Sequence, residues 1–136
     1  MLDSVHNADI GKLLLRLTTG ILILFHGVSK IIHPDNVAWI GQMLGNNGLP
    51  SFLAYGVYVG EVVAPILIIL GLFTRVGGLL VAINMIVALL LVHTHEILTL
   101  GDHGQWIIEL QMFYLMSGLA ILFLGSGKYA VKPDSR

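Results

Sequence analysis

Apolar residues along the chain gather into four stretches that are separated by polar segments containing glycine. The stretches cover residues 10–32, 51–73, 76–93 and 105–124, and each is close to the ~20 residues that an α-helix needs to span a hydrocarbon core. None of them alternates in the way that is typical of a barrel strand. Backbone groups in lipid must bond within helices or closed barrels. We therefore predict an all-α integral membrane protein, a four-helix antiparallel bundle forming a single domain over residues 1–136.

The connections between these stretches differ in length. The second and third stretches are joined by a short turn at residues 71–75, whereas residues 33–50 and 94–105 are longer and polar. In an up-and-down bundle the two long connections lie on one side of the membrane. Basic residues favour the other side, which by the positive-inside rule predicts that both termini are cytoplasmic. These residues are Lys12, Arg16, Arg75, Lys128, Lys132 and Arg136, against Lys30 on the loop side.

The first long connection contains a segment with helical periodicity. Residues 39–44 include a tryptophan, and their apolar side chains recur with the periodicity of a short interfacial helix. Pro34 is suited to its first turn, and the glycines within residues 45–48 are suited to end it. The alternative is a connecting turn that happens to contain a tryptophan.

Composition supports a lipid-covered protein and excludes other classes. Hydrophobic residues make up 56% of the chain and charged residues 11%, which leaves too little polar surface for a water-soluble domain of this size. The net charge of -1 provides no basic patch for nucleic acid. The chain has no cysteine, so redox chemistry would depend on a bound cofactor, a substrate or a partner.

Several ionisable residues fall inside the apolar stretches, where each charge costs ~2.5–3.5 kcal/mol on insertion scales. His26 and Lys30 are four residues apart, and Thr19 lies seven residues before His26. This spacing places the three side chains on one stripe, which we expect to face the bundle. Arg16 has two interpretations: a side chain that snorkels to the cytoplasmic boundary, or one member of a buried ion pair.

Glu61 lies in the middle of the second stretch. It lies beside a ridge of small residues, formed by Gly56, Gly60 and Ala64, which permits close helix contact. The carboxyl group is either ionised against a cation of the first stretch or neutral, because burial disfavours the charged form. Both states make Glu61 a candidate functional residue, and the alternative is a purely structural ion pair.

The third and fourth stretches add further polar residues. Asn84 and His95 are eleven residues apart and share a face in a regular helix, whereas His93 points to the opposite face. The alternative is that both histidines mark the outer membrane interface. Glu109 is expected to enter the bundle, and Gln111 on the opposite face could meet a second protomer in a homodimer.

Running the helices up and down brings these side chains to one pocket that opens to the outer side. Imidazole and carboxylate groups suit a metal ion, for which His26, His95 and Glu61 are the candidates. The same residue types could move protons or donate hydrogen bonds to the carbonyls of a quinone. Spacing alone does not select one of these chemistries.

Short motifs across the chain resemble the DoxX family. The resemblance rests on Leu14-Leu15-Arg16-Leu17, Phe25-His26-Gly27 with Lys30, Gly48-Leu49-Pro50, Gly60-Glu61, residues 70–75, Glu109 and residues 124–129. It implies a multi-pass protein of the bacterial inner membrane that is often labelled an oxidoreductase subunit. The related DoxD branch belongs to a thiosulfate:quinone oxidoreductase.

The resemblance suggests a redox role in the lipid bilayer, and Arg16, His26, Lys30, Glu61, Arg75 and Glu109 match recurring family positions. We expect a membrane subunit that binds a quinone, or a similar small redox ligand, and works with a partner protein. Glu61 and Glu109 would handle protons, and Arg75 would orient the cytoplasmic turn. Ligand binding would fall to His26, Lys30, Asn84, His95 and Arg16. The alternative is a non-enzymatic protein that binds metal or haem, transports a solute or acts as a scaffold. Whether the chain alone is an enzyme stays open.

Overall fold

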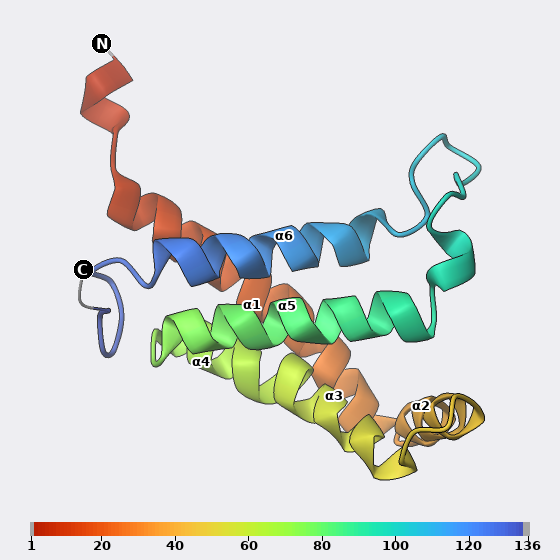
Figure 1. Cartoon of the computed structure of the whole chain (residues 1–136). Coiled ribbons are helices and arrows are strands. Elements are labelled where there is room, and N and C mark those ends of the chain that lie inside the picture. The colour runs from red at the N-terminus through yellow and green to blue at the C-terminus, as the bar shows by residue number, and fades with distance from the viewer. Residues whose placement is uncertain (1, 135–136) are drawn as a thin grey trace.

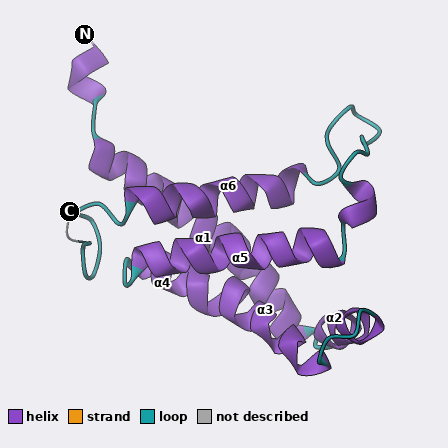
Figure 2. Ribbon diagram, viewed as in Figure 1, coloured by secondary structure: helices purple, strands orange, loops and turns teal. Residues whose placement is uncertain are grey.

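The computed structural model describes residues 2–134 and is all-helical over this part of the chain (Figure 2). Its extended pairing is limited to an isolated bridge between Leu100 and Trp106. The elements in chain order are η1 Leu2–Val5, α1 Ala8–Ile32, α2 Asp35–Asn46, η2 Ser51–Tyr55, α3 Gly56–Tyr58, η3 Val59–Val63, α4 Ala64–Leu70, α5 Thr74–Leu91, η4 Thr94–Glu96 and α6 Glu109–Leu124. The expected all-α class is therefore confirmed.

The long helices pack against one another, and the molecule has two distinct ends. In Figure 1, α5 and α6 lie side by side and run in opposite directions, α4 packs beside α5, and α1 crosses behind them. We call one end the loop end, where α2 and residues 92–108 lie. The other is the turn end, which holds the α4–α5 turn and residues 125–134 (Figure 1). The expectation that both long connections share one end is confirmed.

Two segments are long and apolar enough to cross a membrane, Ser51–Leu70 and Thr74–Leu91, and Glu109–Leu124 is a shorter apolar helix. The first segment combines η2, α3, η3 and α4. It ends at Leu70, not at the expected residue 73, because Gly71 adopts φ 78° and terminates the helix with a left-handed residue.

The two later helices also differ from their expected bounds. The third was expected over residues 76–93 and is observed at Thr74–Leu91, and the fourth was expected over residues 105–124 and begins only at Glu109. Backbone bonds within residues 99–107 close a turn at the loop end, including Gly101 N to Gln105 O at 2.6 Å. These residues are therefore held outside the helix. The short helix expected at residues 39–44 is confirmed within the longer α2.

Glycines bring the helix backbones close together around the core. The core is formed by buried aliphatic side chains of α1, α4, α5 and α6. A Cβ atom built on Gly78 of α5 would lie 2.6 Å from the carbonyl oxygen of Gly118 in α6. The two helices thus pack backbone against backbone, which is typical of helix pairs in membranes.

A π-helical turn interrupts the segment that carries Glu61. In η3, the widened turn gives a hydrogen bond from Ala64 N–H to Val59 O. Pro65, the next residue, has no N–H to donate to the carbonyl of Glu61, four residues earlier. Its ring would also clash with that carbonyl in a regular α-helical turn. On α1, Gly27 packs against this carbonyl. π-Helical turns occur frequently at functional sites, and this one places Glu61 in its centre.

We expect Gly27→Ala to destabilise the protein strongly. A Cβ atom on Gly27 would lie 2.0 Å from the backbone oxygen of Glu61, so α1 and η3 must separate. Overpacking of this kind costs about 3 kcal/mol or more. The measurement is thermal unfolding in detergent, followed by circular dichroism. Gly11→Ala in the same helix is the control, because its Cβ meets nothing within 4 Å. Equal melting temperatures for the two variants would contradict the close α1–η3 contact.

Candidate functional site: a cavity with a polar row

A large cavity lies at the loop end between α1, α2, residues 49–61 and α5. Its volume is about 850 Å³, which is within the ~300–1,000 Å³ range of small-molecule sites. Most of its wall is apolar and includes Ile40, Leu44, Leu53, Val57, Ile83 and Leu91. We call it the ligand cavity. Such a wall suits a ligand with a substantial apolar part.

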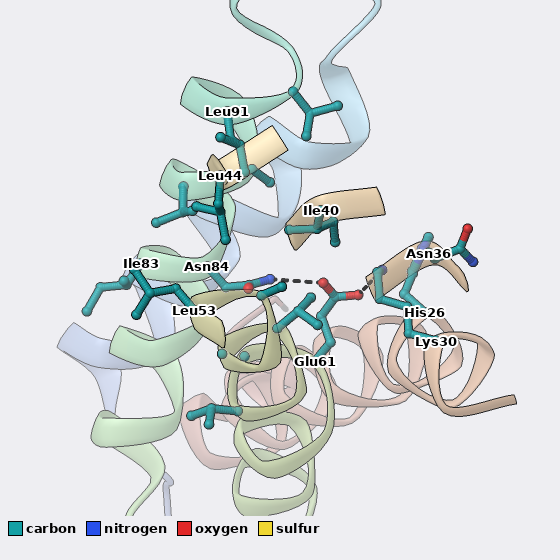
Figure 3. Close-up of a pocket in the computed structure, with 18 of the residues that line it drawn as sticks. His26, Lys30, Asn36, Ile40, Leu44, Leu53, Glu61, Ile83, Asn84 and Leu91 are labelled. Atoms are coloured by element: carbon teal, nitrogen blue, oxygen red, sulfur yellow. Dashed lines mark hydrogen bonds and ion pairs between the residues drawn. The ribbon is translucent and has the colours of Figure 1, made fainter. Parts of the chain in front are cut away.

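Three polar side chains form a row along the wall of the ligand cavity (Figure 3). Lys30 Nζ lies 2.6 Å from Glu61 Oε1, and Asn84 Nδ2 donates to Glu61 Oε2 at 3.2 Å. The Glu61 side chain is only 8% exposed, and that of Lys30 is 21% exposed. The carboxylate therefore accepts hydrogen bonds from two different helices, α1 and α5. We call these three residues the polar row.

Local structure positions each member of the polar row. Lys30 lies in the last turn of α1, where a cation is favoured by the helix dipole. Tyr58 donates a hydrogen bond to the carbonyl oxygen of Lys30 at 3.2 Å, which ties α3 to the end of α1. Gly60 leaves room for Asn84, since a Cβ atom on Gly60 would lie 2.4 Å from the Asn84 side chain.

The polar row retains unused hydrogen-bonding capacity beside the cavity. The Lys30 ammonium has three N–H donors, and Asn84 has a second N–H and a carbonyl oxygen. A buried ion pair is weak evidence for stability, because desolvation opposes the attraction. The geometry therefore leaves polar groups on the cavity wall that could contact a bound molecule.

His26 also lines the ligand cavity, as the sequence predicted. It is exposed on α1, and its ring meets the ring of Tyr114 edge-on with centroids 5.9 Å apart. The structure thus brings together four of the seven predicted site residues. Beside His26 these are the members of the polar row, Lys30, Glu61 and Asn84.

Arg16 lies at the turn end, away from the ligand cavity. Its side chain is buried and donates to four backbone carbonyls: Ile68 O at 2.9 Å, Ser126 O at 3.0 Å, Tyr129 O at 2.6 Å and Ile69 O at 3.2 Å. Carbonyls at a helix C-terminus have no partner within the helix, and Arg16 supplies donors to two at the end of α4. Neither the snorkelling interpretation nor a role in ligand binding fits this geometry.

Arg75 also acts at the turn end, where the sequence placed it. Its Nη1 donates to Leu122 O at 3.2 Å, and its Nε lies 3.8 Å from Asp134 Oδ2. Backbone bonds from residues 131 and 132 to Leu70 O and Gly71 O join the tail to the α4–α5 turn. Arg75 therefore connects the start of α5 to the end of α6 and to the tail.

His95 does not line the ligand cavity, whereas His93 does. The pairing of Asn84 with His95 assumed that regular helical spacing continues beyond the expected end at residue 93, but α5 ends at Leu91 and Thr94–Glu96 forms a separate 3₁₀ turn. The His95 side chain is 78% exposed, and its Nε2 atom lies 3.4 Å from Glu96 Oε1. Because the helical spacing stops at Leu91, the inward histidine is His93.

Glu109 lies outside the cavity lining as well. It is exposed at the first position of α6, where an acidic residue is favoured by the helix dipole. The expectation that it enters the bundle depended on a helix that begins at residue 105. The later start of α6 leaves Glu109 at the surface.

The candidate metal ligands are not gathered into one site. Over residues 2–134 the structure contains no group of three or more His, Asp or Glu side chains that could hold a metal ion. His26 and Glu61 share the ligand cavity, but His95 lies outside its lining. Sequence reasoning also missed Trp39 as a cavity residue, although α2 itself was expected.

These observations define the class of the protein as an all-helical protein with a mostly apolar ligand cavity and a polar row around the buried Glu61. The DoxX family matches residues 11–94 of the chain. Since this match covers more than half of the chain, the protein belongs to the DoxX family. All three members of the polar row fall within the matched residues.

Two relatives extend this comparison. A Bacillus subtilis protein named "Putative oxidoreductase CatD" is 40% identical over 84 residues, which cover 62% of this chain and 60% of that protein. A Haemophilus influenzae protein described as uncharacterized is 29% identical over 124 residues, covering 86% of this chain and 84% of that protein. No solved structure matches the chain.

Proposed function

We propose that this chain is a multi-pass membrane protein that binds a quinone, or a similar amphipathic redox ligand, in the ligand cavity and works with a partner redox protein. The observation that carries the proposal is the polar row on the wall of a cavity of about 850 Å³ that is otherwise mostly apolar. The name of the Bacillus relative includes the word oxidoreductase, which supports a redox role.

Exposed apolar side chains support the membrane location. Phe25 on α1 is 69% exposed, and Phe113 and Phe123 on α6 are 71% and 75% exposed. An apolar surface of this extent marks contact with a membrane or a partner. The basic residues Lys12 and Arg75 lie at the turn end, which agrees with an inner-membrane topology in which both termini are cytoplasmic.

The residues of the ligand cavity fit a quinone. Carbonyl oxygens need donors, and Lys30 and Asn84 both retain free N–H groups on the cavity wall. An isoprenoid tail needs an apolar surface, and α2 and α5 supply one through Leu44 and Leu91, which lie on one side of the polar row in Figure 3. When bound, the quinone would supply two-electron, two-proton chemistry.

Each member of the polar row has a separate task in this proposal. Lys30 donates to a ring oxygen and balances negative charge, which is costly in a low-dielectric site. Glu61 accepts a proton from a ring hydroxyl group and later releases it. Asn84 keeps the Glu61 carboxylate oriented through the bond at 3.2 Å. The electrons would pass to or from the partner protein.

Tryptophan fluorescence tests quinone binding directly. The chain has two tryptophans, and Trp39 lines the ligand cavity whereas Trp106 does not. A Trp106→Phe variant in lipid nanodiscs reports on Trp39 alone, and a short-chain ubiquinone should quench it in a saturable way. In the matched Trp39→Phe variant, quenching should not saturate. Equal, non-saturable quenching in both variants would overturn the proposal.

We expect Val87→Phe to weaken quinone binding by filling the ligand cavity. Val87 lines the cavity from α5, and a phenyl group would occupy space that the ligand needs. An increase in Kd of about tenfold corresponds to ~1.4 kcal/mol. Ile86→Phe is the control, because Ile86 is the neighbouring exposed residue and does not line the cavity. Equal Kd values for the two variants would place the ligand elsewhere.

A further inference from the structure

A second, smaller cavity adjoins the polar row between α1, α5 and α6. Its volume is about 140 Å³, and its polar lining consists of His26, Lys30, Glu61, His93, Gln111 and Tyr114. Four of these residues also line the ligand cavity, whereas Gln111 and Tyr114 belong to the small cavity. Glu61 and His93 thus border two adjoining spaces, only one of which is large enough for a quinone.

The small cavity is suited to hold water. At ~30 Å³ for each molecule, a space of this size holds about four waters. The Oε1 atom of Gln111 is buried and has no hydrogen-bond partner among residues 2–134. Buried polar atoms are nearly always paired with protein or water. A water in the small cavity would supply the donor that Gln111 needs.

The small cavity leads toward the protein surface through a histidine. His93 lines the cavity, and its Nδ1 lies 3.2 Å from Glu96 Oε2. The side chains of His93 and Glu96 are 23% and 30% exposed, at the loop end of the molecule. A chain of titratable groups therefore runs from the buried Glu61 to a partly exposed pair.

We propose that the small cavity, which adjoins the ligand cavity, is a hydrated proton path that connects Glu61 with the loop-end surface. A proton leaves the Glu61 carboxyl group for a water, passes to a ring nitrogen of His93, and is released from the other nitrogen to Glu96 or bulk water. The Glu61 O–H bond breaks as an N–H bond forms on His93, and on release the other N–H bond breaks as an O–H bond forms on Glu96 or water, so no oxidant or reductant is required. The purpose of the path depends on the proposed function, but its existence does not.

Groups from every neighbouring element face this path. Lys30 and His26 face it from α1, and Tyr114 faces it from α6. From α3, the hydroxyl of Tyr58 donates a hydrogen bond to the carbonyl oxygen of Lys30. Lys30 Nζ lies 2.6 Å from Glu61 Oε1 and is therefore in contact with the carboxyl group at which the path begins. Tyr114 and His26 line the small cavity, and their rings contact each other edge-on with centroids 5.9 Å apart.

Cysteine chemistry tests whether the small cavity contains water, and the natural chain contributes no cysteine of its own. Gln111→Cys and Met85→Cys place a thiol in the small cavity from two different helices. Iodoacetamide reacts with the thiolate, which forms where water is present. Leu98→Cys is the exposed positive control at 96% exposure, and Phe113→Cys is the lipid-facing negative control on α6.

We expect both cavity cysteines to be modified in nanodiscs, as intact mass will show, while Phe113→Cys stays unmodified. Adding His93→Phe to Gln111→Cys should slow the modification by about tenfold, because a phenyl ring cannot hydrogen-bond the waters that join the small cavity to the surface, and the thiolate forms only where water is present. His95→Phe, the matched control on an exposed histidine, should leave the rate unchanged.

Failure of the path and failure of the proposed function give different results. If Leu98→Cys reacts while both cavity cysteines stay unmodified, the small cavity is dry and the proton path is overturned, whether or not quinone binds. If the cavity cysteines react equally fast with and without His93→Phe, the route through His93 is overturned. If they react as expected but Trp39 shows no saturable quenching, the path stands and the quinone proposal fails.

Discussion

Glu61→Gln is expected to weaken quinone binding by about 10- to 100-fold, which corresponds to the ~1.5–3 kcal/mol of a charge-assisted hydrogen bond. The substitution keeps the size of the side chain but removes the charge that holds Lys30 Nζ at 2.6 Å and orients Asn84 Nδ2 at 3.2 Å. Lys30 and Asn84, the two donors to the ligand, then lose the carboxylate that positions both of them. The measurement is saturable quenching of Trp39 in the Trp106→Phe background.

Glu96→Gln is the matched control for this prediction. Glu96 also pairs with a basic side chain, His93, but does not line the ligand cavity. Its substitution should leave the Kd for quinone within about twofold of the starting protein. Wild-type affinity in Glu61→Gln would show that the polar row does not recognise the ligand. Adding Lys30→Met then completes a double-mutant cycle, which measures the coupling between the two residues.

Arg16→Met is expected to lower the free energy of unfolding by about 3–5 kcal/mol, because it removes the donor from several buried carbonyls and each unsatisfied group costs ~1–3 kcal/mol. The Arg16 side chain donates to four carbonyls, two at the end of α4 and two in residues 125–134. Methionine fills similar space but donates to none of them. The measurement is unfolding in detergent micelles, followed by circular dichroism.

Two further observations separate a structural role of Arg16 from a role in binding. Arg16→Lys keeps the charge but loses the planar set of five donors, so its stability should fall between those of the wild type and Arg16→Met. Limited proteolysis should cut residues 125–134 faster in Arg16→Met, because the tail loses its contacts at Ser126 and Tyr129. Quinone affinity of the folded protein should not change. Loss of affinity without loss of stability would contradict the structural role.

The helical class could be predicted from the sequence because long apolar runs constrain the backbone strongly. Helix ends were less predictable, since tertiary contacts decide them. Gly71 ended α4 early, and the turn within residues 99–107 delayed the start of α6 to Glu109. The end of α5 at Leu91 left His95 outside the regular helix, and the late start of α6 left Glu109 at its first position; neither residue lines the cavity.

Helical spacing predicted that the members of the polar row share one pocket, but it left open which cation of the first helix pairs with Glu61. Lys30 and Glu61 are far apart in sequence, but each was expected on an inward face, and Asn84 was expected on the inward face of the third helix. The π-helical turn could not be derived in the same way, because it depends on Pro65 together with the close approach of Gly27. The environment of Arg16 consists of backbone carbonyls, which leave no trace in side-chain patterns.

Photo-crosslinking with an azidoquinone tests the central claim most directly, because it reports where the ligand lies. In nanodiscs, the account predicts crosslinks to peptides that contain residues 36–61 or 80–93, which line the ligand cavity. Excess unlabelled quinone and the Val87→Phe variant should both suppress them. Crosslinks confined to the lipid-facing surface of α6 around Phe113, and unaffected by unlabelled quinone, would contradict the account.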